Sequence, residues 1–98
     1  MKKMIFVFNP RSGKEQIKGH LMEILDIFTR AGYEIRVHVT QKQSDAAEVV
    51  ARYGNRVDVV VCSGGDGTLN ETVTGMMKLK KLPMLGYIPA GSTNDFAS

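Results

Sequence analysis

The chain has 98 residues, of which 43% are hydrophobic and 23% charged, and its formal net charge is +3. These values are typical of one globular domain, and the weak positive charge favours anionic ligands without indicating a nucleic-acid partner. A single cysteine, Cys62, excludes an internal disulfide and gives no reason to expect an oxidising compartment. No stretch approaches the roughly 20 apolar residues of a membrane span, so we expect a cytoplasmic protein.

The first predicted elements are a strand and an amphipathic helix. Residues 4–8 form a nearly continuous apolar run, typical of a strand that is covered on both faces. A turn sequence follows at residues 9–13, and a helical pattern runs from Lys14 to Gly32, a residue that can terminate a helix. One face of this helix is apolar, and it consists of Ile17, Leu21, Ile24, Leu25 and Phe28.

Strands and helices continue to alternate along the chain. Residues 33–39 alternate as a second strand, and Ser44 is predicted to cap a second helix that closes at Gly54. Residues 57–62 form the segment with the highest β-propensity, and residues 84–88 give a fourth strand. Between these two strands, a capping box starts a third helix, whose predicted core face is Leu69, Val73, Met76 and Met77.

The order of elements, β-α-β-α-β-α-β, predicts an α/β fold. Each connection is long enough for a crossover helix, so the strands should form a parallel sheet with helices on both faces. We therefore expect a Rossmann-like three-layer sandwich, and we favour the strand order 2-1-3-4. Ligands of such sheets bind at the carboxyl edge of the strands.

Three loops at that edge carry the chemistry, and they follow the first, third and fourth predicted strands. They hold half of the chain's ten glycines: Gly13, Gly64, Gly65, Gly67 and Gly91. Glycine lets a ligand approach the backbone closely, and the start of a helix favours a phosphate group. The convergence of these loops predicts a polyphosphate ligand.

Two common phosphate-binding motifs do not fit. A P-loop needs glycine five positions before the Gly-Lys pair and Ser or Thr after it, but Phe8 and Glu15 occupy those positions. The dinucleotide pattern G-x-G-x-x-G fits Gly65 and Gly67, but Asn70 stands at its third position. Both a P-loop NTPase and a nicotinamide or flavin dehydrogenase are therefore disfavoured.

Three segments together resemble the catalytic domain of diacylglycerol kinases, a family that includes sphingosine and ceramide kinases. The segments are Asn-Pro-Arg-Ser-Gly at 9–13, Gly-Gly-Asp-Gly-Thr-Leu-Asn-Glu at 64–71 and Gly-Ser-Thr-Asn-Asp-Phe at 91–96. The central segment is also similar to the nucleotide loop of NAD kinases and phosphofructokinases, whereas the outer two are more specific to lipid kinases. The resemblance covers residues 1–98 as the N-terminal nucleotide-binding lobe, and it implies that a β-rich C-terminal domain lies outside this chain.

The resemblance implies an ATP site with Mg²⁺. Asp66 is similar to an acidic residue that helps to organise the metal, and Thr40 to a threonine near the nucleotide base. The general base is expected in the C-terminal domain, so we expect no catalytic residue in this chain and no activity from it alone. The implied nucleotide-binding residues are Asn9, Pro10, Arg11, Ser12, Gly13, Thr40, Gly64, Gly65, Asp66, Gly67, Thr68, Leu69, Asn70, Glu71 and Ser92.

Other interpretations remain open for these residues. Ser12 with Glu15, and Thr68 with Glu71, fit capping boxes that only start helices, and Asp66 fits an ordinary turn aspartate. The whole chain also fits a lobe of the NAD kinase or phosphofructokinase type, or a nucleotide-binding module without catalysis. By resemblance the acceptor is a lipid alcohol, with diacylglycerol first, which implies transient contact with the inner face of the membrane.

Overall fold

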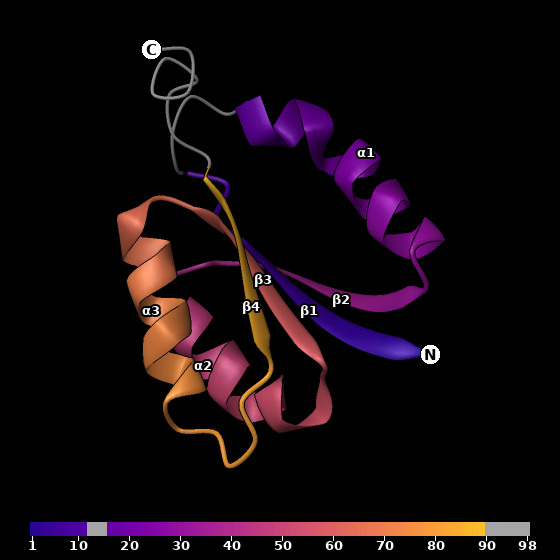
Figure 1. Ribbon diagram of the computed structural model, residues 1–98. Helices are drawn as coiled ribbons and strands as arrows, with labels where there is room; N and C mark the ends of the chain where they lie inside the picture. Colours follow the sequence, from indigo (N-terminus) through magenta and orange to yellow (C-terminus); the bar gives the residue numbers. More distant parts are fainter. Residues whose placement is uncertain (12–15, 90–98) are drawn as a thin grey trace.

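The computed structural model describes residues 1–11 and 16–89. Strands and helices alternate along the chain (Figure 1). In order, they are β1 (Lys2–Phe8), α1 (Gln16–Arg30), β2 (Tyr33–Val39), α2 (Asp45–Tyr53), the short 3-10 helix η1 (Gly54–Arg56), β3 (Val59–Gly64), α3 (Asp66–Met76) and β4 (Met84–Pro89).

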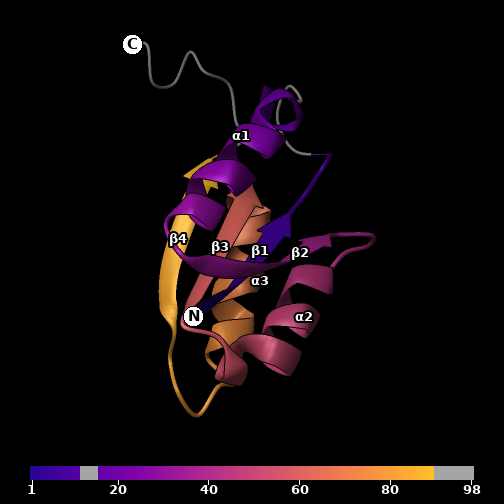
Figure 2. The same ribbon diagram turned by 90° about the vertical axis from the view of Figure 1, so that its right-hand side faces the viewer.

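The four strands form one parallel sheet in the order β2-β1-β3-β4, which confirms the predicted order. Helix α1 covers one face of the sheet, while α2 and α3 lie side by side on the other (Figures 1 and 2). The predicted three-layer α/β sandwich is therefore confirmed. None of the helices within the described ranges is long and apolar enough to cross a membrane.

The central strands β1 and β3 are buried on both faces, as their apolar runs predict. Alternate residues of β1 point to opposite layers, so that Phe6 packs towards α1 and Ile5 towards α2 and α3. The α1 side is filled by the predicted face of that helix, including Leu21, Ile24, Leu25 and Phe28. Helix α1 ends before Gly32, whose φ of 96° is the left-handed conformation expected of a terminating glycine.

The predicted core face of α3 is wrong at two positions. Val73 is 39% exposed and Met77 79% exposed, although Met76 is buried and Leu69 packs against the core. The helix instead turns small residues towards the sheet and α2. Its buried residues are Thr68, Thr72, Gly75 and Met76, a spacing of i, i+4, i+7 and i+8 that defines one helical face.

Candidate functional site

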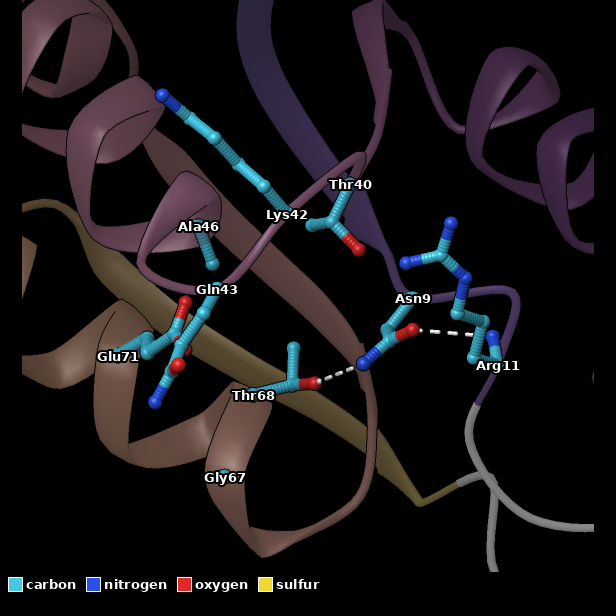
Figure 3. Close-up of a pocket in the computed structure, with 9 residues that line it drawn as sticks. All are labelled: Asn9, Arg11, Thr40, Lys42, Gln43, Ala46, Gly67, Thr68 and Glu71. Carbon is cyan, nitrogen blue, oxygen red and sulfur yellow. Dashed lines mark hydrogen bonds between the residues drawn. The ribbon is translucent and has the colours of Figure 1, made fainter.

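A cavity of about 230 Å³ lies at the carboxyl edge of the sheet. It is bounded by the segment after β1, the segment after β2 and the first turns of α3 (Figure 3). The chain leaves β1 towards α1 on one face of the sheet, and it leaves β3 towards α3 on the other. The crevice between such diverging connections is the usual ligand site of open parallel sheets.

Asn9 holds the segment after β1 against the start of α3. Its backbone N–H donates to the carbonyl oxygen of Ser63 at 2.9 Å, and its side-chain Nδ2 donates to Oγ1 of Thr68 at 3.1 Å. Its Oδ1 accepts a hydrogen bond from the backbone N–H of Arg11 at 3.0 Å, which forms a local Asx turn. The Asn9 amide therefore joins its own segment to the start of α3 through Nδ2, while Oδ1 shapes the local turn (Figure 3).

The turn from β3 into α3 is unusually close. A Cβ atom on Gly64 would lie 2.5 Å from Oγ1 of Thr68, so only glycine allows α3 to begin at this distance from the strand. The hydroxyl of Tyr87 donates to the Gly64 carbonyl at 3.1 Å and supports the turn from β4. The glycines of this loop thus serve close packing as well as ligand access.

The predicted capping box of Thr68 and Glu71 is wrong. Gly65 is the N-cap of α3, the helix begins at Asp66, and Thr68 lies inside its first turn with its hydroxyl bonded to Asn9. The first intrahelical bond runs from the N–H of Leu69 to the carbonyl of Gly65 at 3.2 Å. The N–H groups that precede it have no intrahelical partner, and the positive end of the helix dipole favours an anion there.

The prediction that the Ser44 side chain caps α2 is also wrong. Ser44 occupies the N-cap position, but it has a φ of 71° and makes no side-chain capping bond. The neighbouring Asp45 carboxylate instead accepts from the backbone N–H of Gln41 at 2.7 Å and lies 3.0 Å from Nε2 of His38. This arrangement fixes the segment after β2 that forms one wall of the cavity.

Charged side chains stand on two sides of the cavity. Arg11 stands on the wall opposite Glu71, while Lys42 contributes its aliphatic stem and points its ammonium away (Figure 3). That ammonium lies 3.6 Å from the carboxylate of Glu48. The buried Thr40, which is 8% exposed, adds a hydroxyl side chain between these walls. The lining therefore offers hydroxyl, amide and both signs of charge, a set suited to a polar ligand.

The structure brings together six of the side chains and backbones implied by the resemblance. Those that line the cavity are Asn9, Arg11, Thr40, Gly67, Thr68 and Glu71. Pro10 lies within the same segment as Asn9, and Gly64 and Gly65 form the turn behind the cavity. Ser12, Gly13 and Ser92 lie outside the described residues, and so does the loop after β4 that the prediction placed at this site.

Three further implied residues belong to α3 but are not part of the cavity lining. Leu69 packs against the core, Asn70 is exposed, and Asp66 is exposed at the first position of the helix. Burial raises the pKa of the Tyr87 phenol, and the negative charge of Asp66 raises it further.

The sequence reasoning missed Lys42, Gln43 and Ala46, which complete the lining. It treated the loops after the first, third and fourth strands as the chemical ones, and it took only Thr40 from the segment after the second. A parallel sheet sends the ends of all its strands to one edge. That rule would have brought the whole segment after Thr40 into the candidate site.

Comparison with known proteins identifies the family. Residues 3–98 match the diacylglycerol kinase catalytic domain. This chain belongs to that family. It is 44% identical to the diacylglycerol kinase of Bacillus subtilis (strain 168) over 98 residues, which cover 99% of this chain and 32% of that protein. It is 43% identical over 96 residues to a diacylglycerol kinase of Staphylococcus aureus (strain bovine RF122 / ET3-1), covering 97% of this chain and 30% of the relative.

Solved structures of the family have the same fold. A crystal structure of a diacylglycerol kinase from Bacillus anthracis str. Sterne superposes with a TM-score of 0.83 at 30% sequence identity, covering 97% of this chain and 35% of that one. The chain thus spans about a third of the length of the relatives it matches. These comparisons support the resemblance found in the three loop segments.

Proposed function

We propose that this chain forms the nucleotide-binding lobe of an ATP-dependent lipid kinase. The complete protein would transfer the terminal phosphoryl group of ATP to the hydroxyl of a lipid alcohol, with diacylglycerol as the first candidate acceptor and phosphatidic acid as its product. Membership of the diacylglycerol kinase catalytic domain family supports the reaction class. The cavity at the carboxyl edge supports the placement of the nucleotide in this lobe.

One observation carries the proposal most strongly: the N-terminus of α3 opens at a cavity that also holds Arg11. Gly67 and Thr68, within the first turn of α3, line that cavity, and a Cβ atom on Gly67 would meet nothing within 4 Å. Backbone N–H groups, a helix dipole and a guanidinium together suit phosphate oxygens. Open space beside Gly67 lets such a group approach the backbone.

The cavity accommodates part of a nucleotide. Ligand pockets usually measure roughly 300–1,000 Å³, whereas this one measures about 230 Å³. We infer that the phosphates lie over the start of α3 and that the base lies towards Thr40 and Ala46, where buried small side chains leave room for a flat ring. Glu71 and Gln43, on the remaining wall, are then placed to accept or donate hydrogen bonds to the ribose or base.

Asp66 fits a magnesium ion better than a direct phosphate contact. Its exposed carboxylate stands at the helix start next to Gly67, where an unscreened negative charge would repel phosphate. Mg²⁺ is commonly held by one or two carboxylates together with water and substrate phosphates. The described residues hold no group of three or more His, Cys, Asp or Glu side chains placed for a metal, so such an ion would depend on the nucleotide for its other ligands.

The lobe would contribute positioning and charge neutralisation, which dominate phosphoryl transfer. Asn9 holds the segment that carries Arg11 against α3, so that the guanidinium and the helix N-terminus face one ligand. Magnesium, when bound, neutralises charge on the phosphates. Proton removal from the acceptor hydroxyl is assigned to residues outside this chain, so residues 1–98 alone should bind nucleotide without catalysing transfer.

The test is a pair of measurements on the complete protein that contains this chain. We expect titration calorimetry to detect ATP binding. In a separate assay with mixed micelles, we expect labelled phosphate to be transferred from ATP to diacylglycerol. NAD, fructose 6-phosphate and sphingosine serve as alternative acceptors. Transfer to NAD or to the sugar phosphate instead of lipid would favour a kinase of the NAD kinase or phosphofructokinase type. If the protein binds ATP but transfers phosphate to none of these acceptors, it is a nucleotide-binding module without catalytic activity.

Asp66→Ala provides the residue-level test of the metal assignment. We expect kcat to fall by about 10²-fold or more, because loss of a metal-supported interaction costs several kcal/mol of transition-state stabilisation. The ATP dissociation constant should change by far less. Asp26→Ala, which removes an exposed carboxylate paired with Arg30 on α1, is the matched control and should leave kcat unchanged. Equal kcat in Asp66→Ala and the parent protein would remove Asp66 from the mechanism.

A further inference from the structure

The segment between β2 and α2, with the first turn of that helix, supplies the largest share of the cavity wall. Four of the nine lining residues come from it: Thr40, Lys42, Gln43 and Ala46 (Figure 3). Of these four, only Ala46 belongs to a helix or strand. The shape of this wall therefore depends on the contacts that hold an irregular stretch of backbone. We call residues 40–44 the wall segment.

One carboxylate holds the wall segment from behind. Asp45 is not part of the cavity lining, but it lines the neighbouring groove between β2 and α2. Its Oδ2 accepts a hydrogen bond from the backbone N–H of Gln41 at 2.7 Å and lies 3.0 Å from Nε2 of His38. Its own backbone N–H donates to the carbonyl oxygen of Lys42 at 3.2 Å. The Asp45 side chain is only 14% exposed, so these contacts are largely shielded from water.

His38 ties this carboxylate to the sheet. It lies in β2 and is the register partner of Val7 in the buried strand β1. The backbone N–H of Gln41 holds the pKa of the Asp45 carboxyl below its usual range, although burial opposes the shift, so the group is ionised at neutral pH. Because an ionised carboxylate only accepts hydrogen bonds, we assign a proton to Nε2 of His38. The contacts thus run from the sheet through His38 and Asp45 to the backbone of the wall segment.

The backbone next to Asp45 depends on such support. Ser44 has a φ of 71°, and among the described residues it alone has a positive φ without being glycine. This left-handed conformation is unfavourable for a residue with a side chain, so it persists only where surrounding contacts hold it. Ser44 makes no side-chain capping bond of its own. We therefore expect the turn to relax when the Asp45 carboxylate is removed, and Gln43 to shift in the cavity wall.

We propose that Asp45, supported by His38, is a positioning residue that sets the affinity of this lobe for the nucleotide. With the base placed towards Thr40 and Ala46, Asp45 touches no part of the ligand and acts through the wall segment. The inference rests on the proposed function, because it requires ATP in the cavity. The phosphates are assigned to the start of α3, on a different wall. Loss of Asp45 should therefore weaken nucleotide binding more than it slows the transfer step.

A role limited to starting α2 makes a different prediction. A negative charge in the first turn of a helix stabilises that helix through its dipole, and its loss would lower stability without changing a folded site. A matched carboxylate separates the two roles, since Oδ2 of the exposed Asp58 also accepts from a backbone N–H, that of Lys3, at 2.8 Å. Asp58 directly precedes β3, at the edge of the sheet opposite the cavity. The six residues of β3 place roughly 20 Å between them.

The experiment measures the Kd for ATP by titration calorimetry, and KM for ATP and kcat with diacylglycerol in mixed micelles, on the complete protein. We expect Asp45→Ala to raise Kd and KM by about tenfold and to change kcat by less than about twofold, the pattern of lost ground-state binding. Asp45→Asn keeps an acceptor oxygen but loses the charge, so both values should rise by about threefold. Asp58→Ala is the control and should leave all three values within about twofold of the parent protein.

A double-mutant cycle tests the support from His38. His38→Ala should raise the Kd for ATP by about threefold, and adding it to Asp45→Ala should raise Kd by less than about 1.5-fold more, since both side chains act through one contact. Effects that simply multiply would overturn the pairing. If Asp45→Ala does not fold, Asp45→Asn and His38→Ala carry the test.

Two results would overturn the inference alone: equal Kd values for ATP in the Asp45 and Asp58 variants, or a lower kcat in the Asp45 variants with Kd and KM unchanged. A parent protein that binds no ATP would instead overturn the proposed function, and the inference with it. Because calorimetry needs no acceptor, a wrong choice of lipid would leave the comparison of Kd values intact. The two proposals can therefore fail separately.

Discussion

The two helical layers are held to the sheet by different kinds of side chain. On one face, α1 packs large side chains against the sheet. The centroid of the Phe28 ring lies 6.3 Å from that of Phe6 and 6.4 Å from that of Tyr33. On the other face, α2 and α3 approach each other through small residues. A Cβ atom on Gly75 would lie only 2.6 Å from the carbonyl oxygen of Ala47. The α1 layer is therefore held by large side chains such as the half-buried Phe28, whereas the α2–α3 layer cannot accept added volume.

The largest expected effect comes from adding volume to the α2–α3 layer. Gly75→Val should destabilise the fold by about 3 kcal/mol, because the new side chain meets the backbone of α2 and not the flexible end of a side chain. Chemical denaturation followed by circular dichroism measures the change. Gly19→Ala is the matched control in α1, where an added Cβ atom meets nothing within 4 Å. It should stabilise the protein by about 0.5–1 kcal/mol through helix propensity. Similar losses in both variants would refute the contrast between the layers.

Removing volume from the α1 layer should cost less. Phe28 is half-buried, so Phe28→Ala should lower the free energy of unfolding by about 2 kcal/mol, somewhat less than the 3–5 kcal/mol typical of a fully buried phenylalanine. The adjacent Ile27 is 56% exposed, and Ile27→Ala should cost well under 1 kcal/mol. Thermal unfolding of the two variants side by side tests whether the aromatic contacts of Phe28 hold α1 in place. Equal midpoints for Phe28→Ala and the parent protein would show that they do not.

The same contrast between layers determines what the sequence could predict. Apolar patterns located the strands and the face of α1, since large apolar side chains fill the core there, and the alternation of strands with helices predicted the parallel sheet. It failed for α3, where Thr68 and Thr72 are buried and Val73 and Met77 are not. A buried threonine is tolerated because its hydroxyl finds a partner: Thr72 donates to the carbonyl of Thr68 at 2.8 Å. Such partners follow from tertiary contacts, which a pattern of apolar residues does not contain.

The candidate site was predicted to a similar extent. The loop segments gave Asn9, Arg11, Gly67, Thr68 and Glu71, and these do line one cavity. The roles of Thr68 and Ser44 as helix caps were wrong, because α3 begins at Asp66 with Gly65 as its N-cap, and because Asp45 rather than Ser44 bonds the segment after β2. Lys42, Gln43 and Ala46 carry no motif, so only the rule that all strand ends of a parallel sheet meet at one edge could have pointed to them.

Two glycines of the β3–α3 turn allow a finer test at the site itself. Gly64→Ala should destabilise the protein by about 2 kcal/mol, since its Cβ atom would collide with Thr68 and disturb the bond from Asn9. Gly67→Ala should leave stability unchanged or slightly higher, because its Cβ atom enters open space. If phosphate occupies that space, Gly67→Ala should weaken ATP binding by about tenfold or more, a cost of ~1.4 kcal/mol. Unaltered ATP affinity in a stable Gly67→Ala variant would show that the phosphates of ATP do not occupy the space beside Gly67.

The smallest expected effect concerns the polar contacts that start α2. The backbone N–H of Gln41 holds the pKa of the Asp45 carboxyl below its usual range, with burial opposing this shift and His38 and Lys42 supporting it. Because the folded-state pKa is lower than the unfolded value of about 3.9, the ionised carboxylate adds stability above that pH. This contribution is lost as the pH falls through the lowered folded-state pKa.

Asp45→Asn should therefore be less stable than the parent protein at pH 7, and the difference should shrink steadily below about pH 4. Denaturant midpoints measured between pH 3 and pH 7 would follow this difference, with Asp26→Asn, which removes an exposed carboxylate on α1, as the control. A difference that stays constant across this range would assign the role of Asp45 to shape and hydrogen bonding alone. Close packing alone would then hold the α2–α3 layer, and the ionised carboxylate in the first turn of α2 would add nothing to its stability.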